Sequence, residues 1–309
     1  MQKVLSLCFP TYNRGWCMKE QIERLKKCPK ETLDKMEIII SDNCSTDDTK
    51  QIVTDAIKNG FPAIYHRNSE NLGMDGNFVT CFRMAKGKYV WLLGDDDPII
   101  VDALVKIVER LSSDVEYGLM HIDQLKRADS DDSFVEFDDS ESFCRTISYY
   151  TSLISANIVR TEYVPEINFE KYMGTWFTLI PLYITGVLKQ RVNVLVNFNV
   201  FENSRDFARN GGYNYFEVFV TNYLSIWKEF LDAGSISKAT FDFLKKDVYE
   251  GTVSRYIVYM LLMHRMTDKY KTDGAWKILF SNYWNKPYFY KAPIKFFFER
   301  FYGKYLRKS

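Results

Sequence analysis

Three consecutive acids, Asp95, Asp96 and Asp97, directly follow the apolar run at residues 89–93. An apolar run of this length predicts a buried strand, which would place the acids at its carboxyl end, where open α/β proteins bind ligands. Adjacent carboxylates repel one another unless a cation lies among them. Mg²⁺ and Mn²⁺ prefer oxygen ligands, and Mg²⁺ usually combines one or two carboxylates with substrate phosphates. The acids therefore predict a metal–diphosphate site, with a solvated acidic turn as the alternative.

The composition is that of a folded globular protein. The chain has 309 residues, of which 46% are hydrophobic and 26% charged, and its formal net charge is +1. A charge so close to zero gives no argument for a nucleic-acid partner. The six cysteines include no Cys-x-x-Cys pair and the three histidines stand apart, so neither a zinc site nor a disulfide framework is expected. We expect a cytoplasmic chain without a signal peptide or a membrane-spanning segment.

Short apolar runs alternate with stretches of helical periodicity through the first 200 residues. This alternation predicts an α/β fold with right-handed crossovers and a mostly parallel sheet. After residue 200 the chain becomes helical and rich in aromatic residues. We therefore expect a nucleotide-binding domain at residues 1–200 and a helical region at residues 201–309. Strands are expected at residues 4–9, 37–40, 63–66, 89–93 and 117–122, with Pro10 ending the first and Ser45 capping the helix that follows the second.

Four polar loops follow the first four expected strands, at residues 9–14, 41–47, 70–77 and 93–97. Together they resemble family 2 glycosyltransferases of the GT-A fold. The first loop is similar to that family's P-T-Y-N start. The second is similar to its D-D-x-S-x-D-x-T, with Ser41 where an acid is common, and the fourth to its D-x-D element, with Gly94 in place of the first acid. The L-L-G-D-D-D form resembles enzymes of bacterial surface polysaccharides, including the abequosyltransferase-like group.

The resemblance covers roughly residues 1–185 and implies a GT-A, Rossmann-like sheet flanked by helices, with a helical C-terminal extension. It also implies a nucleotide-sugar donor, a saccharide acceptor and a divalent ion, Mn²⁺ or Mg²⁺. Asp96 falls at the metal-binding position, and Asp95 falls where the family contacts ribose or the waters of the metal. Asp97 is a third acid near the metal or the cap of the next helix.

The remaining donor contacts are also implied by the resemblance. Asp42 aligns with the acid that recognises the base, and a carboxylate there can accept the N3–H of uracil or thymine. Cytosine lacks this hydrogen, so Asp42 favours a UDP or dTDP donor over CDP. Arg14 would contact phosphate, or form an exposed salt bridge. The other donor-binding residues expected are Pro10, Thr11, Tyr12, Asn13, Asn71, Gly73 and Asn77. The alternative for the last three is that they only form a capped turn and do not contact the donor.

The general base is not identified by the resemblance. An inverting transferase needs a carboxylate that deprotonates the acceptor hydroxyl, and the family commonly supplies an E-D pair. The matching stretch here, residues 172–177, contains no acid. The nearest candidates are Glu170, Glu202 and Asp206. The catalytic residues expected are Asp96, Glu170 and Asp206. Trp176 could stack on an acceptor sugar or belong to the core.

Three alternatives stay open at this point. The chain could be a transferase with another donor or a retaining outcome, or an inactive transferase-like domain that binds a sugar nucleotide or a partner protein. A nicotinamide oxidoreductase would fit the α/β pattern, but no Gly-x-Gly-x-x-Gly follows the first strand. A processive polymer synthase is disfavoured because the chain has neither membrane spans nor Q-x-x-R-W.

Residues 286–309 carry seven basic residues and one acid, interleaved with aromatic residues. A helix starting after Pro293 would align Phe297, Phe301 and Tyr305 on one face. Such a helix can lie on an anionic bilayer, and residues 292–309 are therefore expected to contact a membrane surface. This would suit an acceptor carried on a membrane lipid at the inner face of the cytoplasmic membrane. Alternatively, these aromatics pack on the catalytic domain or on another subunit of an oligomer.

Overall fold

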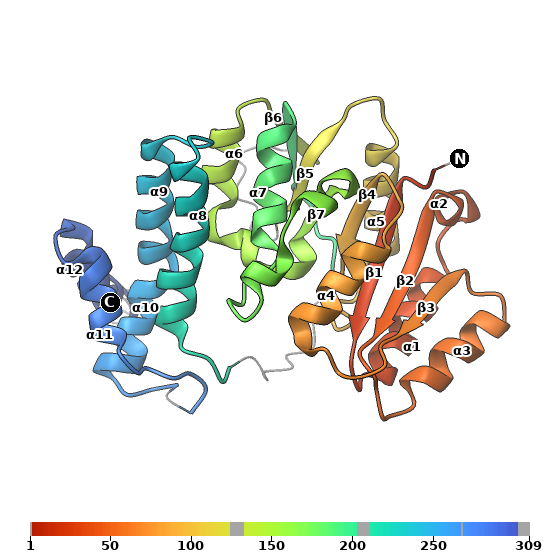
Figure 1. Ribbon diagram of the computed structural model, residues 1–309, viewed down its shortest axis with the longest axis horizontal. Coiled ribbons are helices and arrows are strands. Elements are labelled where there is room, and N and C mark those ends of the chain that lie inside the picture. Colours follow the sequence, from red (N-terminus) through yellow and green to blue (C-terminus); the bar gives the residue numbers. More distant parts are fainter. Residues whose placement is uncertain (1, 124–132, 203–210, 267, 302–309) are drawn as a thin grey trace, which may run out of the picture. The chain divides into compact units, whose positions relative to one another are not determined.

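The computed structural model describes residues 2–123, 133–202, 211–266 and 268–301. The chain forms two compact units (Figure 1). The first unit comprises residues 1–174 and 178–206, and the second comprises residues 175–177 and 207–309. The functional division at residue 200 stays a prediction.

Within the described residues, eight strands form one mixed sheet in the order β3-β2-β1-β4-β7-β5-β8-β6. Parallel pairs join β1 to β2 and β4, β2 to β3, and β5 to β8, whereas β7 and β6 run antiparallel to their neighbours. The predicted α/β architecture is confirmed. The strands are β1 (Leu5–Thr11), β2 (Met36–Asp42), β3 (Ala63–Arg67), β4 (Tyr89–Leu92), β5 (Tyr117–Ile122), β6 (Phe134–Phe137), β7 (Asn157–Arg160) and β8 (Val192–Val196).

Helices cover both faces of this sheet, because alternate strand residues point to opposite sides and both sides are apolar. One core joins Leu5, Leu7 and Phe9 of β1 to the apolar stripes of α1, α3 and α5. On the other face, α4 contacts β1 and β2, and α7 contacts β5 and β7 (Figure 1). The helices of this unit are α1 (Gly15–Leu25), α2 (Lys30–Asp34), α3 (Thr49–Lys58), α4 (Gly73–Met84), α5 (Val101–Leu111), α6 (Ser140–Ile147) and α7 (Ile180–Lys189).

The chain order in the sheet reverses beside β1. From β1 it proceeds to β2 and β3 on one side, and then returns to add β4 on the other. In open α/β sheets, such a switch leaves a crevice at the carboxyl ends of the two diverging strands, and ligands bind there. The ends that meet at this switch are Thr11 of β1 and the acid turn after β4.

Pro10 does not end the first strand as expected, because β1 continues to Thr11. Pro10 pairs in register with Ser41 of β2, whereas the pairing of β1 with β4 stops at Cys8. The Thr11 carbonyl accepts a hydrogen bond from the Asn43 amide on the β2 side, so the ring of Pro10 lies toward the β4 side, beyond the last paired residue. A proline is tolerated where no neighbour needs its N–H, and the strand therefore runs through it.

The second unit is helical, as expected. Its helices are α8 (Tyr223–Asp232), α9 (Lys238–Val248), α10 (Ser254–Tyr256), α11 (Ala275–Tyr283) and α12 (Pro287–Phe301), with π-helical segments at Glu217–Asn222, Tyr249–Val253 and Ile257–Leu262. The expected start of the last helix after Pro293 is wrong: α12 begins at Pro287 and contains Pro293. Proline favours the first helical position, and Pro287 takes that role. Among the helices described, none combines the length and apolar character needed to cross a bilayer.

The approach of β5 to α7 depends on Gly118. A Cβ atom at this position would lie 2.1 Å from the Gly186 carbonyl oxygen. We expect Gly118→Ala to reduce the free energy of unfolding by about 3 kcal/mol or more, the upper end of overpacking costs, since the clash is with backbone and the backbone must shift to relieve it. Gly234→Ala is the control. A Cβ atom at Gly234 would have no heavy atom within 4 Å, but the φ of this residue is +69°. Gly234→Ala should therefore cost only about 1–2 kcal/mol of left-handed backbone strain. Equal losses in denaturant unfolding would contradict the packing argument.

Candidate functional site

The acid turn after β4 is tied to the loop after β1 by the side chain of Asp95. This side chain is 4% exposed and accepts hydrogen bonds from Thr11 Oγ1 at 2.7 Å and from Arg14 Nη1 at 2.8 Å. Burial raises the pKa of Asp95 to about 6, and Arg14 and Thr11 act in the opposite direction. The predicted partners Thr11, Arg14 and Asp95 are thus in contact, at the switch between β1 and β4.

Arg14 bridges two of the three acids. The nitrogen that contacts Asp95 also lies 2.9 Å from Asp96 Oδ2. Burial disfavours the charged guanidinium, yet its attraction to Asp95 and Asp96 raises the pKa of Arg14. The expected alternatives for Arg14 were a phosphate contact or an exposed salt bridge. Its side chain is 37% exposed and pairs with one buried and one half-buried acid, so oxygens of both acids converge on one positively charged atom.

Asp97 has a different side-chain partner, Ser155. Its carboxylate accepts a hydrogen bond from the Ser155 hydroxyl, which itself accepts from the Gly94 amide at 2.9 Å. No side chain caps α5, so Asp97 does not take the expected role of a helix cap. Burial raises the pKa of Asp97. Gln21 of α1 donates to the Asp97 carbonyl at 2.7 Å, so the backbone of the turn is also anchored to α1.

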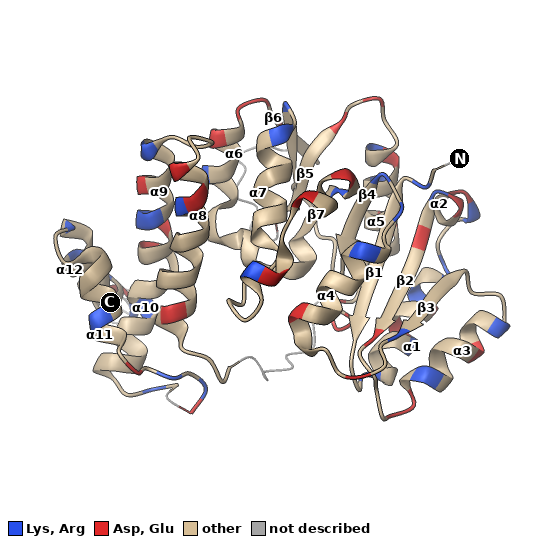
Figure 2. Ribbon diagram, viewed as in Figure 1, with Lys and Arg blue, Asp and Glu red and all other residues tan. Residues whose placement is uncertain are grey.

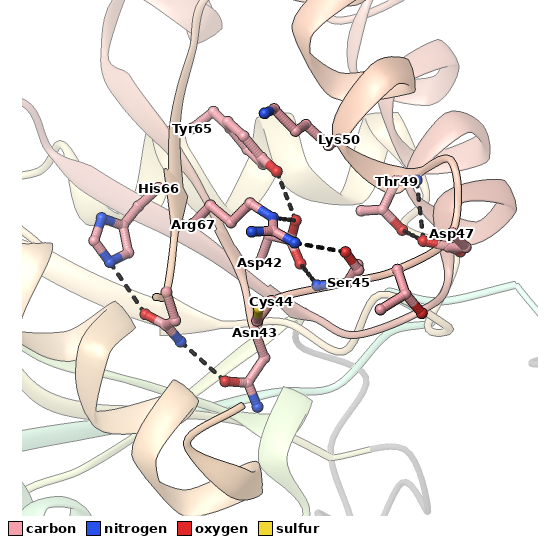
Figure 3. A network of polar contacts seen from close by, with 12 residues as sticks. Asp42, Asn43, Cys44, Ser45, Asp47, Thr49, Lys50, Tyr65, His66 and Arg67 are labelled. Atoms are coloured by element: carbon pink, nitrogen blue, oxygen red, sulfur yellow. Dashed lines mark hydrogen bonds and ion pairs between the residues drawn. The ribbon is translucent and has the colours of Figure 1, made fainter. Parts of the chain in front are cut away.

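Asp42 ends β2 and is fully buried within a polar network (Figure 3). Its Oδ1 accepts from the Ser45 amide at 2.7 Å, and its Oδ2 accepts from the Tyr65 hydroxyl at 2.6 Å and lies 3.4 Å from Arg67 Nε. Burial and Asp42 raise the pKa of Tyr65, which keeps its hydroxyl protonated as a donor. Both carboxylate oxygens therefore already have partners from β3 and from the loop after β2.

A second polar network joins α4 to β2 and β3. Asn77 is buried, donates to the Ser41 carbonyl at 3.0 Å, and accepts from the Ser41 hydroxyl at 2.7 Å and from Asn68 at 3.1 Å. Ser41 occupies the position where an acid is common in the family that the loops resemble. Here its short hydroxyl fits beside Asn77. The side chain of Asn77 therefore links α4 to the ends of β2 and β3.

Asn43 extends this network to the turn at the start of α4. Its amide nitrogen donates to Asn71 Oδ1 at 2.8 Å and to the Gly73 carbonyl at 3.0 Å. Gly73 has a φ of +73°, which glycine adopts without strain. Asn71 Oδ1 also accepts from the Gly73 amide at 2.9 Å. The predicted residues Asn71 and Gly73 thus form a braced turn at the same edge of the sheet.

Asn13 and Ser45 connect the first two loops. The Asn13 amide donates to Ser45 Oγ at 2.9 Å, and its side chain accepts from the Thr46 amide at 2.7 Å. The expectation that Ser45 caps the next helix is wrong, because α3 begins at Thr49 after Asp48. The hydroxyl of Ser45 instead serves the loop contact. Tyr12, one residue earlier, is 43% exposed beside this contact.

The candidate general bases are less well placed for proton transfer. Glu170 pairs with Arg83 and Glu202 pairs with Arg24, and each arginine lowers the pKa of its partner carboxyl. A carboxylate with a lowered pKa is a weaker base, so neither pairing favours the catalytic role. Asp206 lies outside the described residues.

Trp176, in the second unit, has a φ of +71° and is 43% exposed. It is therefore not the core tryptophan that was the alternative to an acceptor contact. Its ring packs on Tyr213 with centroids 4.4 Å apart.

Sequence reasoning missed several residues of this site, among them Gln21, Tyr65, Arg67 and Ser155. Two of them carried a readable signal. Gln21 is a polar residue beside the apolar stripe of α1, and Arg67 ends the strand next to that of Asp42. Ser155 and the hydroxyl of Tyr65 are brought in by tertiary contacts that span 58 and 23 residues of sequence, for which no local pattern exists.

A divalent ion would depend on the carboxylate oxygens of the acid turn. In the part of the chain that the structure describes, no group of three or more His, Cys, Asp or Glu side chains is arranged to hold a metal. Asp95 and Asp96 nevertheless direct oxygens to one point, now taken by Arg14 Nη1. Two carboxylates completed by substrate phosphates suit Mg²⁺ or Mn²⁺. The residues present therefore fit an ion that binds together with a diphosphate.

Sequence comparisons agree with the loops described above. Residues 6–134 match the model described as glycosyl transferase family 2. The chain is 35% identical over 193 residues to abequosyltransferase RfbV of Salmonella typhimurium, covering 56% of this chain and 57% of that protein. It is 31% identical over 119 residues to a GalNAc(5)-diNAcBac-PP-undecaprenol beta-1,3-glucosyltransferase of Campylobacter jejuni, covering 38% and 36%. The matches thus span about half or less of these relatives.

Structural comparisons identify the fold as that of GT-A glycosyltransferases. The S. aureus TarS fragment 1–349 in complex with UDP-GlcNAc has a TM-score of 0.61 at 15% identity, covering 87% of this chain and 74% of that one. The mannosyltransferase PcManGT of Pyrobaculum calidifontis, in complex with GDP-Man and Mn²⁺, has a TM-score of 0.51 at 16% identity, covering 81% and 70%. Identities this low establish the fold alone.

Removing Arg14 tests whether the acid turn can hold a cation, because Arg14 contacts both Asp95 and Asp96. We expect Arg14→Met to lower the free energy of unfolding by about 1–2 kcal/mol, because Asp95 stays buried without its cation. Millimolar Mn²⁺ should recover this loss in a thermal-shift assay without any nucleotide. Arg67→Met is the matched control, because Arg67 pairs with the single acid Asp42. Equal recovery of both variants by Mn²⁺ would contradict a cation site at the acid turn.

Proposed function

We propose that this chain, whose residues 6–134 match the model of glycosyl transferase family 2 and whose fold is that of GT-A glycosyltransferases, transfers a sugar from a nucleoside diphosphate to a saccharide hydroxyl. The observation that carries this proposal is the convergence of Asp95 and Asp96 on one cationic atom at the switch between β1 and β4. Breaking the glycosidic bond builds up negative charge on the leaving diphosphate, and stabilising that charge is the main task of such a site.

The chain's own residues divide this task. Asp96, the more exposed of the converging acids, would hold a divalent ion together with Asp95, and the bound ion would offset the charge of the diphosphate. Thr11 and Gln21 hold the turn in place, so the acids need little rearrangement on binding. Arg14 would then be available to the phosphates. Mn²⁺ is supported by its presence with the donor in the mannosyltransferase of the same fold.

The nucleoside would lie over the loops after β1 and β2. The donor-binding residues proposed there are Pro10, Thr11, Tyr12, Asn13 and Asp42, and those proposed from the turn after β3 and the start of α4 are Asn71, Gly73 and Asn77. UDP is the preferred nucleotide and dTDP the second, which agrees with UDP-GlcNAc bound to the TarS fragment. Since the oxygens of Asp42 already accept hydrogen bonds from protein donors, a direct contact with the base would have to share one of them.

The acceptor is proposed to be a saccharide of a bacterial surface polysaccharide, carried on a membrane lipid. The two curated relatives support this choice, and the name of one specifies an undecaprenyl diphosphate-linked acceptor. The enzyme would then work at the inner face of the cytoplasmic membrane, with residues 292–309 in contact with it. Inversion is expected, with Glu170 or Asp206 as the base.

A second candidate function is a transferase-like protein that binds the nucleotide sugar without turnover. The observation that favours it is the pairing of both described base candidates with arginines. Donor hydrolysis separates the two, because many transferases slowly hydrolyse their own donor. A screen of nucleotide sugars with Mn²⁺ that shows binding by calorimetry and no hydrolysis or transfer would favour the second function.

Asp96→Asn tests the metal role. We expect normal folding and a loss of transfer of about 100- to 1,000-fold at saturating Mn²⁺, the scale of losing about 3–4 kcal/mol of charge stabilisation. Asp102→Asn, an exposed acid in the first turn of α5, is the control and should retain activity. Transfer by Asp96→Asn within tenfold of the unmodified protein would reject the assignment.

Asp42→Asn tests nucleotide recognition, because its amide oxygen can still accept from the Ser45 amide and its amide nitrogen can donate to the Tyr65 hydroxyl oxygen. Losing the charged acceptor should weaken UDP binding by about 10- to 150-fold, which corresponds to about 1.5–3 kcal/mol. Tyr65→Phe keeps the carboxylate and should lose much less affinity in the same calorimetric titration. If Tyr65→Phe loses as much affinity as Asp42→Asn, or more, the base is not read by the carboxylate.

A further inference from the structure

Helix α11 carries two apolar stripes of which only one is buried. Leu279 and Tyr283 are completely buried in the second unit. Trp276, Phe280 and Trp284, which recur at the i, i+4 and i+8 spacing of one helix face, are 45%, 46% and 63% exposed. A tryptophan exposed to this extent is uncommon in a folded protein, and three large aromatics in one line make a contiguous apolar surface.

Helix α12 continues this surface. Tyr290, Ile294 and Phe298 are also spaced at i, i+4 and i+8 and are 53%, 57% and 54% exposed. The two helices meet through Phe289, whose ring centroid lies 5.4 Å from that of Phe280 and 4.9 Å from that of Tyr290. The Tyr290 hydroxyl also donates to the Trp284 carbonyl at 2.8 Å. We define the aromatic face by six exposed residues: Trp276, Phe280, Trp284, Tyr290, Ile294 and Phe298.

The chain around the aromatic face is strongly basic. Residues 274–309 contain eight basic residues and one acid, Glu299. Those within the described helices and the turn between them are Lys277, Lys286, Lys291, Lys295 and Arg300. Helices α8 and α9 carry acids and bases side by side and pair Lys228 with Asp232 and Lys238 with Asp242 (Figure 2). In α12, Lys295 pairs with Glu299, and the other basic residues named outnumber this one acid. A partner of the aromatic face must therefore accept aromatic rings and be negatively charged.

We propose that the aromatic face is a docking surface for an anionic phospholipid bilayer. Tryptophan and tyrosine favour the boundary between headgroups and acyl chains, because one part of the ring is apolar and another is polar. Basic side chains around them add attraction to anionic headgroups. The surface extends the contact expected for residues 292–309 to α11. It does not depend on the proposed transferase activity, which can be lost without affecting it.

Flotation with liposomes tests this proposal on the full-length chain. The protein should float with vesicles of phosphatidylcholine and phosphatidylglycerol, and much less with phosphatidylcholine alone or in 0.5 M NaCl. Phe280→Ser combined with Trp284→Ser should weaken binding at least about tenfold, because each removes apolar area that the bilayer would cover. Lys277→Gln with Lys291→Gln should weaken it about 25-fold, at about fivefold per charge.

Phe243→Ser is the matched control, because Phe243 is 43% exposed but lies on α9. It should float like the unmodified protein. Brominated lipids give a second readout, since they should quench the fluorescence of Trp276 and Trp284. Replacing both by Phe should abolish most of this quenching while binding is retained. Equal flotation of all variants, or quenching unchanged in the Phe variant, would overturn the proposal.

The alternative partner of the aromatic face is a second copy of this chain. If that were the partner, analytical ultracentrifugation without lipid would show a dimer, and Phe280→Ser combined with Trp284→Ser would convert it to a monomer. That result, together with no flotation on anionic vesicles, would replace the membrane by a homodimer interface. Loss of flotation with intact donor hydrolysis, or the reverse, separates this surface from the transferase site.

Discussion

A buried carboxylate is the constraint on which the candidate site depends. An ionised group removed from water is costly unless donors and an opposite charge surround it. Asp95 meets this requirement with Thr11 at the end of β1 and Arg14 before α1. Because both partners come from the loop after β1, burial of Asp95 fixes that loop against the turn after β4. The crevice at the topological switch is therefore defined by electrostatics as well as by the order of the strands.

The loops after β2 and β3 are fixed by neutral groups on the same principle. Asn43, Asn68 and Asn77 satisfy one another and the nearby backbone, and a fully satisfied buried network holds its members in one arrangement. Asp42 links the same two strands through Tyr65. All four loops are therefore braced before any ligand binds. Such preorganisation lowers the cost of orienting a donor, which is why sites of this kind are built on strand ends.

The sequence predicted the first five strands, the order of the loops that follow them and the identity of the acids, because apolar runs and turn residues are local signals. It did not predict β6, β7 and β8. It also did not predict which partner each of the three acids contacts. Asp95, Asp96 and Asp97 look equivalent in sequence, yet one is buried against Thr11, one faces Arg14 and one accepts from Ser155. Those partners lie 84, 82 and 58 residues away. Likewise, Pro10 seemed to end a strand because local reasoning could not show that its ring lies beyond the pairing with β4.

In the second unit, the sequence also left open which side chains of a helix are buried. Helical spacing in α11 gives two apolar stripes of similar strength, and sequence alone cannot say which is the core. Packing buries Leu279 and Tyr283, whereas 45% of Trp276, 46% of Phe280 and 63% of Trp284 stay exposed, and folding does not use the hydrophobic free energy of this exposed area. That unused free energy is available to an external surface. The acid site and the aromatic face thus differ in kind: one satisfies its charges internally, and the other keeps its apolar area for a partner.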